Sequence, residues 1–335
     1  MVSLLLSALV GATPLEVAVL SKDVASSTLE VRWQPMTAAT LAEPFARLEV
    51  HPDETFRAVV LPGTKRVAVV RITGLARDPS FVATLSIVSP GQAERVLATD
   101  VVRASKPTLV GSRVFVERGV AGPERTDGSY RVDALTVSEV DLQSGRLRTV
   151  FETKGYWTHV AGAVGRELIV YVAGPKGAAL EAVQIDTLAV RTLISSMPAM
   201  AHDFVIDIEH QRVLFTIAEP GVERWFIDQV DVATGKRARL AEGDHVALLP
   251  TLLPTGLAWS TGAGRGLSWL GRDGVALAPH GAGFERVRFV ADGLVFARHE
   301  VPGSAPSAFV TRLRDGAPVP VVFPPGIVDV AGVNR

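Results

Sequence analysis

Three histidines recur along the chain at a constant interval. His159, His202 and His245 are separated by 43 and 43 residues, and each precedes an apolar segment typical of a buried strand. Imidazole is the commonest neutral metal ligand, and three imidazoles with an open fourth position are typical of a catalytic site. The spacing therefore predicts a ring of three histidines that would bind a divalent metal ion.

A second set of residues takes comparable positions relative to the apolar segments. Its members are Arg57, Lys106, Arg286, Tyr156, Trp157 and Asp203. Cationic side chains that converge would bind an anionic group through charge-assisted hydrogen bonds. An anion-binding cup, with the two aromatic residues and Asp203 at its edge, is therefore the competing interpretation of the same region.

The elements that position these residues are short strands in a repeating unit. Residues 140–148 read V-D-L-Q-S-G-R-L-R and residues 230–239 read V-D-V-A-T-G-K-R-A-R, each a strand, a turn ending in glycine and a second strand. A third copy lies midway, at residues 184–193, with Ala189 in place of the turn glycine. The copies set a repeat of about 45 residues, which is the period of a β-propeller blade.

Four short strands in each repeat predict an all-β protein, a β-propeller in which seven blades are favoured over six blades with an N-terminal extension. A single sheet cannot bury both of its faces, whereas a ring of sheets buries every face against a neighbour. We expect residues 15–50 to supply three strands of one blade and residues 328–335 its inner strand, so that both termini close the ring. A helical turn is expected over 37–43 and a projecting loop over 118–133.

Composition limits the classes of partner and compartment. The 335 residues carry 47% apolar side chains and a net charge of −1, which suits a large core and disfavours nucleic acid as a partner. Cysteine is absent, so disulfides and thiolate metal sites are excluded. Residues 1–12 resemble the apolar region of a secretory signal, which predicts a periplasmic or secreted protein with one propeller domain over 13–335. If they form an inner strand instead, the protein is cytoplasmic. After this segment no apolar run is long enough for a membrane-spanning helix.

Three turn-and-strand segments carry a resemblance to known repeats. Residues 61–69, 253–259 and 291–296 resemble the blade motif of the TolB-like repeats, within the large group of propellers that includes WD40 proteins. The resemblance implies a propeller fold and carries no activity with it. In WD40 blades a histidine before the inner strand holds a loop by hydrogen bonds, which is a structural interpretation of His245.

The function we expect is non-enzymatic: a binding or scaffold propeller whose ligand or partner protein meets one rim of the central channel. The alternative is a metal-dependent lyase or hydrolase that uses the histidine ring on an anionic or carbohydrate substrate. A component of an envelope assembly, contacting its neighbours through residues 118–133, is a third hypothesis. Asp141, Asp186 and Asp231 are expected to accept hydrogen bonds in hairpin turns, and the tryptophans of the strands are expected to pack between blades.

Overall fold

The structure is a computed structural model in which the regular elements are all β-strands. It describes residues 15–23, 25–51, 54–73, 82–101, 107–128, 130–153, 157–174, 177–197, 201–218, 224–243, 247–253, 256–261, 267–271, 284–301, 303–314 and 316–334. Within these ranges there is no helix with the length and apolar character that crossing a membrane requires. The signal-like segment 1–12 lies outside the described residues.

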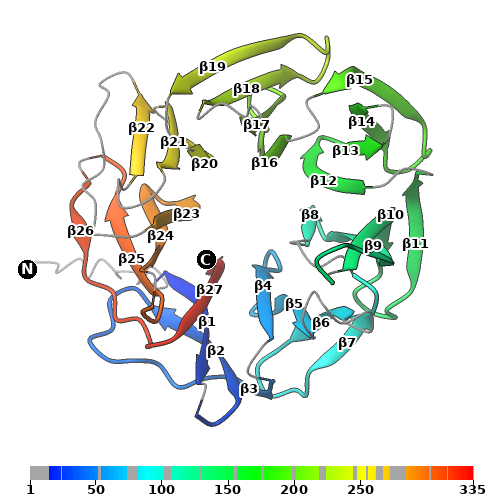
Figure 1. Ribbon diagram of the computed structural model, residues 1–335. Helices are drawn as coiled ribbons and strands as arrows, with labels where there is room; N and C mark the ends of the chain where they lie inside the picture. The colour runs from blue at the N-terminus through cyan, green and yellow to red at the C-terminus, as the bar shows by residue number, and fades with distance from the viewer. Residues whose placement is uncertain are drawn as a thin grey trace, which may run out of the picture.

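The strands form seven sheets arranged as a ring (Figure 1). We name the sheets A to G in their order around the ring and give their strands from the ring axis outward. Sheet A is β27 (Ile327–Asn334), β1 (Glu16–Asp23), β2 (Thr28–Pro35) and β3 (Ala46–Glu49); sheet B is β4 (Thr55–Val60), β5 (Val67–Thr73), β6 (Val82–Val88) and β7 (Arg95–Ala98). Sheet C is β8 (Thr108–Val110), β9 (Arg113–Glu124), β10 (Tyr130–Val140) and β11 (Leu147–Glu152); sheet D is β12 (Trp157–Val164), β13 (Glu167–Gly174), β14 (Gly177–Gln184) and β15 (Val190–Met197). Sheet E is β16 (Ala201–Asp207), β17 (Arg212–Ala218), β18 (Trp225–Asp231) and β19 (Arg237–Gly243); sheet F is β20 (Ala247–Leu253), β21 (Gly256–Thr261) and β22 (Leu267–Gly271); sheet G is β23 (Phe284–Ala291), β24 (Leu294–Glu300), β25 (Ser307–Arg312) and β26 (Pro318–Val319).

Neighbouring sheets meet through their inner strands, those nearest the axis. β12 contacts β8 and β16, β20 contacts β16 and β23, and β27 contacts β23 and β4. The strands within a sheet are antiparallel, and each sheet from B to G begins with its inner strand. We call the face of the ring at which the inner strands begin the entry face, and the opposite one the exit face. The β-propeller predicted from the repeats is confirmed.

Sheet A joins distant parts of the chain. β27 pairs antiparallel with β1, with Val330 opposite Val19 and Asp329 opposite Leu20. The backbone nitrogen of Lys22 also donates to the carbonyl of Gly326, 2.9 Å away, just before β27 begins. The inner strand of this sheet therefore comes from the C-terminal part of the chain and its other three strands from residues 16–49.

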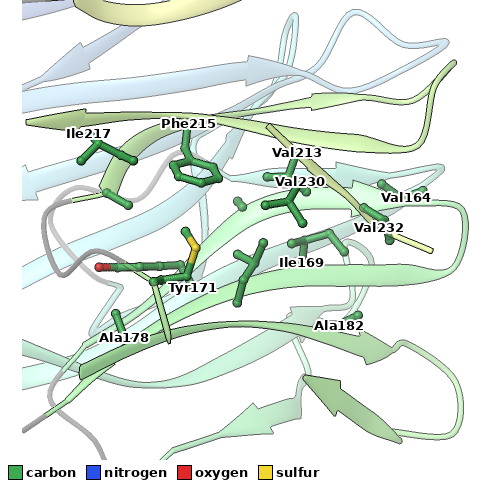
Figure 2. Packing of buried hydrophobic residues seen from close by; sticks show 14 of the residues in the cluster. Val164, Ile169, Tyr171, Ala178, Ala182, Val213, Phe215, Ile217, Val230 and Val232 are labelled. Carbon is green, nitrogen blue, oxygen red and sulfur yellow. The ribbon is translucent and has the colours of Figure 1, made fainter. Parts of the chain in front are cut away.

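The core lies between facing sheets, as the contact between sheets D and E illustrates. Ile169 and Tyr171 of β13 pack against Val213 and Phe215 of β17 (Figure 2). Alternate residues of a strand point to opposite faces, so each sheet contributes apolar side chains to two such contacts. Burying one of these side chains stabilises the fold by about 1.5–3 kcal/mol. The predicted packing role of the tryptophans is confirmed for three that are 7%, 7% and 8% exposed: Trp33, Trp225 and Trp259.

The helical turn predicted over 37–43 is wrong, because this segment is a loop held by two buried side chains, those of Gln34 and Arg32. The amide of Gln34, which is 0% exposed, donates to the carbonyl of Thr40 at 3.0 Å and accepts from the nitrogen of Ala42 at 2.9 Å. Arg32 Nε donates to the carbonyl of Ala42 at 3.1 Å. Side-chain partners thus satisfy backbone groups that a helix would have paired with one another.

The projecting loop predicted over 118–133 is instead mostly strand. β9 and β10 pair as a hairpin over most of this segment, with Asp133 opposite Val120 and Tyr130 opposite Glu124. The glycines and charges that suggested a loop lie mostly within a two-stranded antiparallel ladder. A partner-binding loop is therefore not the form that this segment takes.

The third copy of the repeated hairpin is shifted by one residue from its predicted register. The backbone nitrogens of Gly145, Gly235 and Leu188 each donate at 2.8 Å to the first residue of their turns. Leu188, with φ of 60°, therefore takes the place of the turn glycine, and Ala189 does not.

Two of the three aspartates have the predicted turn role. Asp141 accepts from the nitrogen of Ser144 at 2.6 Å, and Asp231 accepts from that of Thr234 at 2.7 Å. In sheet D the first residue of the turn is Gln184, two residues before Asp186, so Gln184 takes the equivalent place. Asp186 instead forms ion pairs with arginines, so the prediction was wrong for this residue.

Replacing Gly235 by alanine is expected to destabilise the protein by at least about 2 kcal/mol, a value typical of backbone strain combined with overlap. Gly235 has φ of 70°, and a Cβ atom there would overlap the carbonyl oxygen of Leu193 in sheet D. The matched control is Gly165→Ala, with φ of 58° and no atom within 4 Å of the added carbon. Urea unfolding measures both variants; equal losses of stability would show that the contact with Leu193 has no effect.

Candidate functional site

The entry face carries two clusters of charged side chains at the same height in the ring. His159 on β12 lies opposite Tyr171, and Asp329 on β27 lies opposite Leu20. Tyr171, Leu20, Glu117 and Arg298 are each the fifth residue of the second strand of their sheets. Equivalent positions in successive blades thus bring residues from distant repeats to one level of the ring.

The first cluster, the imidazole–carboxylate cluster, consists of Glu117, His159, His202, Asp203 and Phe204. Glu117 is 2% exposed and its Oε1 accepts from the His159 Nδ1, 2.9 Å away, and from the nitrogen of Val160 at 2.5 Å. His202 Nδ1 lies 3.0 Å from Asp203 Oδ2. The Phe204 ring packs at 5.6 Å from the His159 imidazole. One buried carboxylate therefore links the inner strand of sheet D to the second strand of sheet C.

Glu117 changes the titration of its imidazole partner. Burial alone would lower the pKa of His159, but the Glu117 charge and its hydrogen bond, with the Asp203 charge, raise that pKa above its usual value. Opposite charges favour the protonated imidazole in this environment. The His159 side chain is 29% exposed, so it is open to solvent while its Nδ1 is held.

The second cluster, the arginine cluster, consists of Arg57, Arg288, Arg298, Glu300 and Asp329. Asp329 is 0% exposed; it pairs with Arg288 and accepts from the nitrogen of Ala58 at 2.9 Å. Arg298 Nη1 donates to the carbonyl of Val328 at 2.7 Å, and its Nε lies 3.3 Å from Glu300 Oε1. These contacts connect sheets G, A and B across two blade interfaces.

The arginines of this cluster repel one another. Burial, together with the neighbouring charges of Arg288 and Arg57, lowers the pKa of Arg298, although Glu300 and Asp329 oppose the effect. Three guanidinium groups face two carboxylates, so the cluster keeps an excess of positive charge. Such an arrangement favours an anionic group that approaches the entry face.

The structure brings four of the predicted site residues into the two clusters and leaves the others partly or wholly undescribed. His159 and His202 occupy the same register position in sheets D and E, within the inner strands rather than in the connections before them. Asp203 lies beside His202 and acts on His159, and Arg57 belongs to the arginine cluster. The remaining predictions lie partly or wholly outside the described residues: only the backbone is described for Trp157 and Arg286, and nothing for His245, Lys106 and Tyr156.

The three-histidine metal site stays a prediction, since its third ligand is not among the described residues. Within the part of the chain that the structure describes, no group of three or more histidine or carboxylate side chains could hold a metal ion. His159 and His202 each have Nδ1 bound to a carboxylate, an arrangement that leaves Nε2 as the ring atom for a ligand.

Sequence reasoning missed five charged residues of the two clusters: Glu117, Arg288, Arg298, Glu300 and Asp329. A signal was present for two of them, because Glu117 follows the apolar run Val-Phe-Val at 114–116 and Asp329 interrupts the apolar run at 327–331. A charge at such a position must be paired across a blade interface or exposed at the axis.

Comparison with known proteins supports the fold and leaves the function open. No known protein family matches the chain, and no curated protein matches it. Among solved structures, a prolyl endopeptidase is 12% identical with a TM-score of 0.61, over 95% of this chain and 50% of the peptidase. A puromycin hydrolase is 13% identical with a TM-score of 0.56, over 94% of this chain and 55% of the hydrolase. TolB from Acinetobacter baumannii is 12% identical with a TM-score of 0.49, over 95% of this chain and 65% of TolB.

These similarities concern the fold alone. The predicted resemblance to known propellers is confirmed at that level by the two structures with TM-scores of 0.61 and 0.56. The chain spans about half the length of the two enzymes, so their activities are not transferred to it.

Proposed function

We propose that the protein is a non-enzymatic binding propeller that takes a ligand or partner protein at its entry face. The observation that supports this proposal is the separation of charge around the ring axis. The arginine cluster belongs to sheets G, A and B, and the imidazole–carboxylate cluster to sheets C, D and E (Figure 1). A partner with an acidic group on one side and a basic group on the other would complement this face.

The position of the charges on strands favours binding to a preformed surface. Glu117 and Asp329 are buried and bonded to backbone nitrogens of the next sheet, so their positions are fixed by the blade interfaces. A surface that is already ordered loses little conformational entropy when a partner binds. Recognition at the entry face therefore needs no rearrangement of the ring.

Charge reversal at the entry face is expected to weaken partner binding at least about tenfold. This corresponds to a loss of about 1.4 kcal/mol of binding free energy when a complementary charge is removed. Arg57→Glu adds a negative charge to the arginine cluster. Arg166→Glu is the matched control, because Arg166 is 76% exposed on the exit face. Partners retained from an extract of the source cells are identified, purified and titrated against both variants. Equal affinity of the two variants for every purified partner would contradict binding at the entry face.

The metal-dependent enzyme remains a second candidate because two of its three proposed ligands share a register position. Elemental analysis of the purified protein tests it directly. Stoichiometric zinc or another divalent metal that disappears in His159→Ala and His202→Ala would favour this candidate over the binding propeller. Metal-free protein that still binds its partner at the entry face would exclude it.

We also propose that pairing between β27 and β1 keeps seven blades closed as one ring. Support comes from the eight-residue length of both strands and from the buried pair of Asp329 with Arg288, which joins sheet A to sheet G. Opening the ring would require stripping β27 from a paired sheet. Export to the periplasm or medium is proposed only from the signal-like residues 1–12.

A further inference from the structure

A cavity of about 530 Å³ lies on the exit face between sheets B and C, away from both entry-face clusters. Its walls come from the hairpin turns that follow β4, β6 and β10. The residues that line it are Arg66, Ile87, Ser89, Gln92, Ala93, Arg95, Leu142 and Gln143. Two of them are arginines and none is acidic, so the cavity lining carries two positive charges.

Arg95 is one of three arginines that join neighbouring sheets in the same way. Arg95 Nη1 donates to the carbonyl of Gln143 at 2.7 Å, and its Nη2 donates to that of Leu142. In the next crevice Arg148 donates to the carbonyl of Ile185, and in the one after it Arg191 donates to that of Val232, both at 2.9 Å. The contact with the following sheet is thus a repeated structural feature of the ring.

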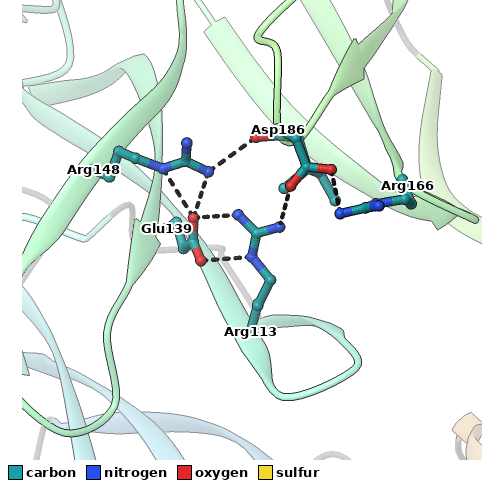
Figure 3. Close-up of polar contacts among 6 residues, drawn as sticks. Arg113, Glu139, Arg148, Arg166 and Asp186 are labelled. Carbon is teal, nitrogen blue, oxygen red and sulfur yellow. Dashed lines mark hydrogen bonds and ion pairs between the residues drawn. The ribbon is translucent and has the colours of Figure 1, made fainter.

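The other two crevices balance the charge of this arginine with a carboxylate. Arg148 pairs with Glu139 at 2.7 Å, and Arg191 pairs with Glu167 at 2.7 Å. Between sheets C and D the ion pairing extends further, because Arg113 bonds Glu139 and Asp186 while Arg166 also binds Asp186 (Figure 3). In that crevice three arginines meet two carboxylates, and every guanidinium group has an acidic partner.

The crevice between sheets B and C lacks these carboxylates. The carbonyl that accepts from Arg95 belongs to Leu142, and the next residue is Gln143. The corresponding carbonyl in the crevice between sheets C and D belongs to Ile185, and the next residue is Asp186. A neutral amide therefore takes the place of a carboxylate. Arg66 has no acidic partner among the described residues, in contrast to Arg113 and Arg166. Equivalent positions in one molecule therefore differ in charge. Of the three crevices compared, among the residues that the structure describes, the one between sheets B and C combines two arginines with an open cavity that no acidic residue lines.

We infer that this cavity binds a phosphate-type oxyanion, either free or as the ester of a small molecule. Guanidinium groups bind phosphate and sulfate through paired charge-assisted hydrogen bonds. The Ser89 hydroxyl and the amides of Gln92 and Gln143 supply neutral donors beside them. The volume lies within the range of about 300–1,000 Å³ that is usual for small-molecule pockets. The site lies on the face opposite the proposed partner surface and does not depend on that proposal.

Calorimetric titration with inorganic phosphate, glucose 6-phosphate and glucose tests the inference at low ionic strength. Phosphate is expected to bind with a dissociation constant on the order of 1 mM or lower. Tighter binding of glucose 6-phosphate would identify an organic ester as the ligand, and equal binding would identify the phosphate group alone; both outcomes support the site. Binding of glucose with the affinity of its phosphate, or no binding of either phosphate, would overturn it.

Two variants and one control locate the binding. Gln143→Asp places a carboxylate where the next crevice has Asp186, and Arg66→Gln removes one charge without removing the Arg95 contact. Each is expected to weaken phosphate binding at least about tenfold, the effect of one lost charge-assisted contact. Arg191→Gln breaks the corresponding contact between sheets D and E and should leave binding unchanged. Unchanged binding in Gln143→Asp and Arg66→Gln, in proteins with wild-type melting temperatures, would show that phosphate binds elsewhere.

Discussion

A chain that ends before Ile327 is expected to lose cooperative unfolding. The deletion removes β27, whose Ile327, Val330 and Ala331 are 0%, 1% and 4% exposed, together with the buried carboxylate of Asp329. Each lost aliphatic side chain costs about 1.5–3 kcal/mol, and leaving a buried charge such as Arg288 without its partner costs about 3–5 kcal/mol. The total is comparable with the stability of a whole domain, about 5–15 kcal/mol. Differential scanning calorimetry measures the transition.

A peptide of residues 324–335 supplied in trans distinguishes ring closure from a general loss of folding. If β27 acts by pairing with β1, the peptide should restore a single transition to the truncated chain, and a peptide with Asp329→Ala should restore it less well. The Asp329 carboxylate accepts from two backbone nitrogens and from Arg288, so its loss removes three contacts at once. A truncated chain with the melting temperature and cooperativity of the full chain would contradict the proposed role of β27.

The repeat could be predicted from the sequence because hairpin chemistry is local. Asp141 and Asp231 each bond their own turns, and the glycines that follow have positive φ, so both features are written in short segments. The register of the third copy could not be found in the same way. Leu188 adopts a φ that glycine usually supplies, and the surrounding sheet, rather than the residue type, imposes it.

The candidate site was harder to predict because its contacts join blades that are far apart in sequence. Asp329 meets the nitrogen of Ala58 across 271 positions, and no local pattern marks such a pair. The histidine interval corresponds to one shared register position for His159 and His202, although both lie within inner strands and not in the connections before them. It did not reveal Glu117, which belongs to the preceding blade and is hidden among apolar neighbours. The spacing of residues along the sequence identifies equivalent positions in successive blades. Contacts between residues of different blades can be identified only from the three-dimensional structure.

Replacing Glu117 by alanine is expected to destabilise the protein by about 3–5 kcal/mol, the cost of breaking a buried pair by removing one partner. The change leaves the nitrogen of Val160 and the Nδ1 of His159 without their acceptor. Glu117→Gln keeps an acceptor oxygen and a similar shape but removes the charge, so it should cost less. Urea unfolding at pH 6 compares the three proteins; equal stability of Glu117→Ala and wild type would show that the linkage between sheets C and D has no energetic role.

Glu117→Gln and a second variant, His159→Gln, are expected to change how the stability of the protein depends on pH. The pKa of His159 is raised in the folded protein, so its contribution is fully present below the unfolded pKa, about 6.5, and is lost as pH rises through the folded value. The free energy of unfolding of the wild type should therefore fall as the pH rises from 6 to values above the pKa that His159 has in the folded protein. Glu117→Gln removes the charge that raises this pKa, and His159→Gln removes the titrating group, so both variants should lack this part of the decline. A decline of the same size in all three proteins would show that another group causes it and that Glu117 does not hold a proton on His159.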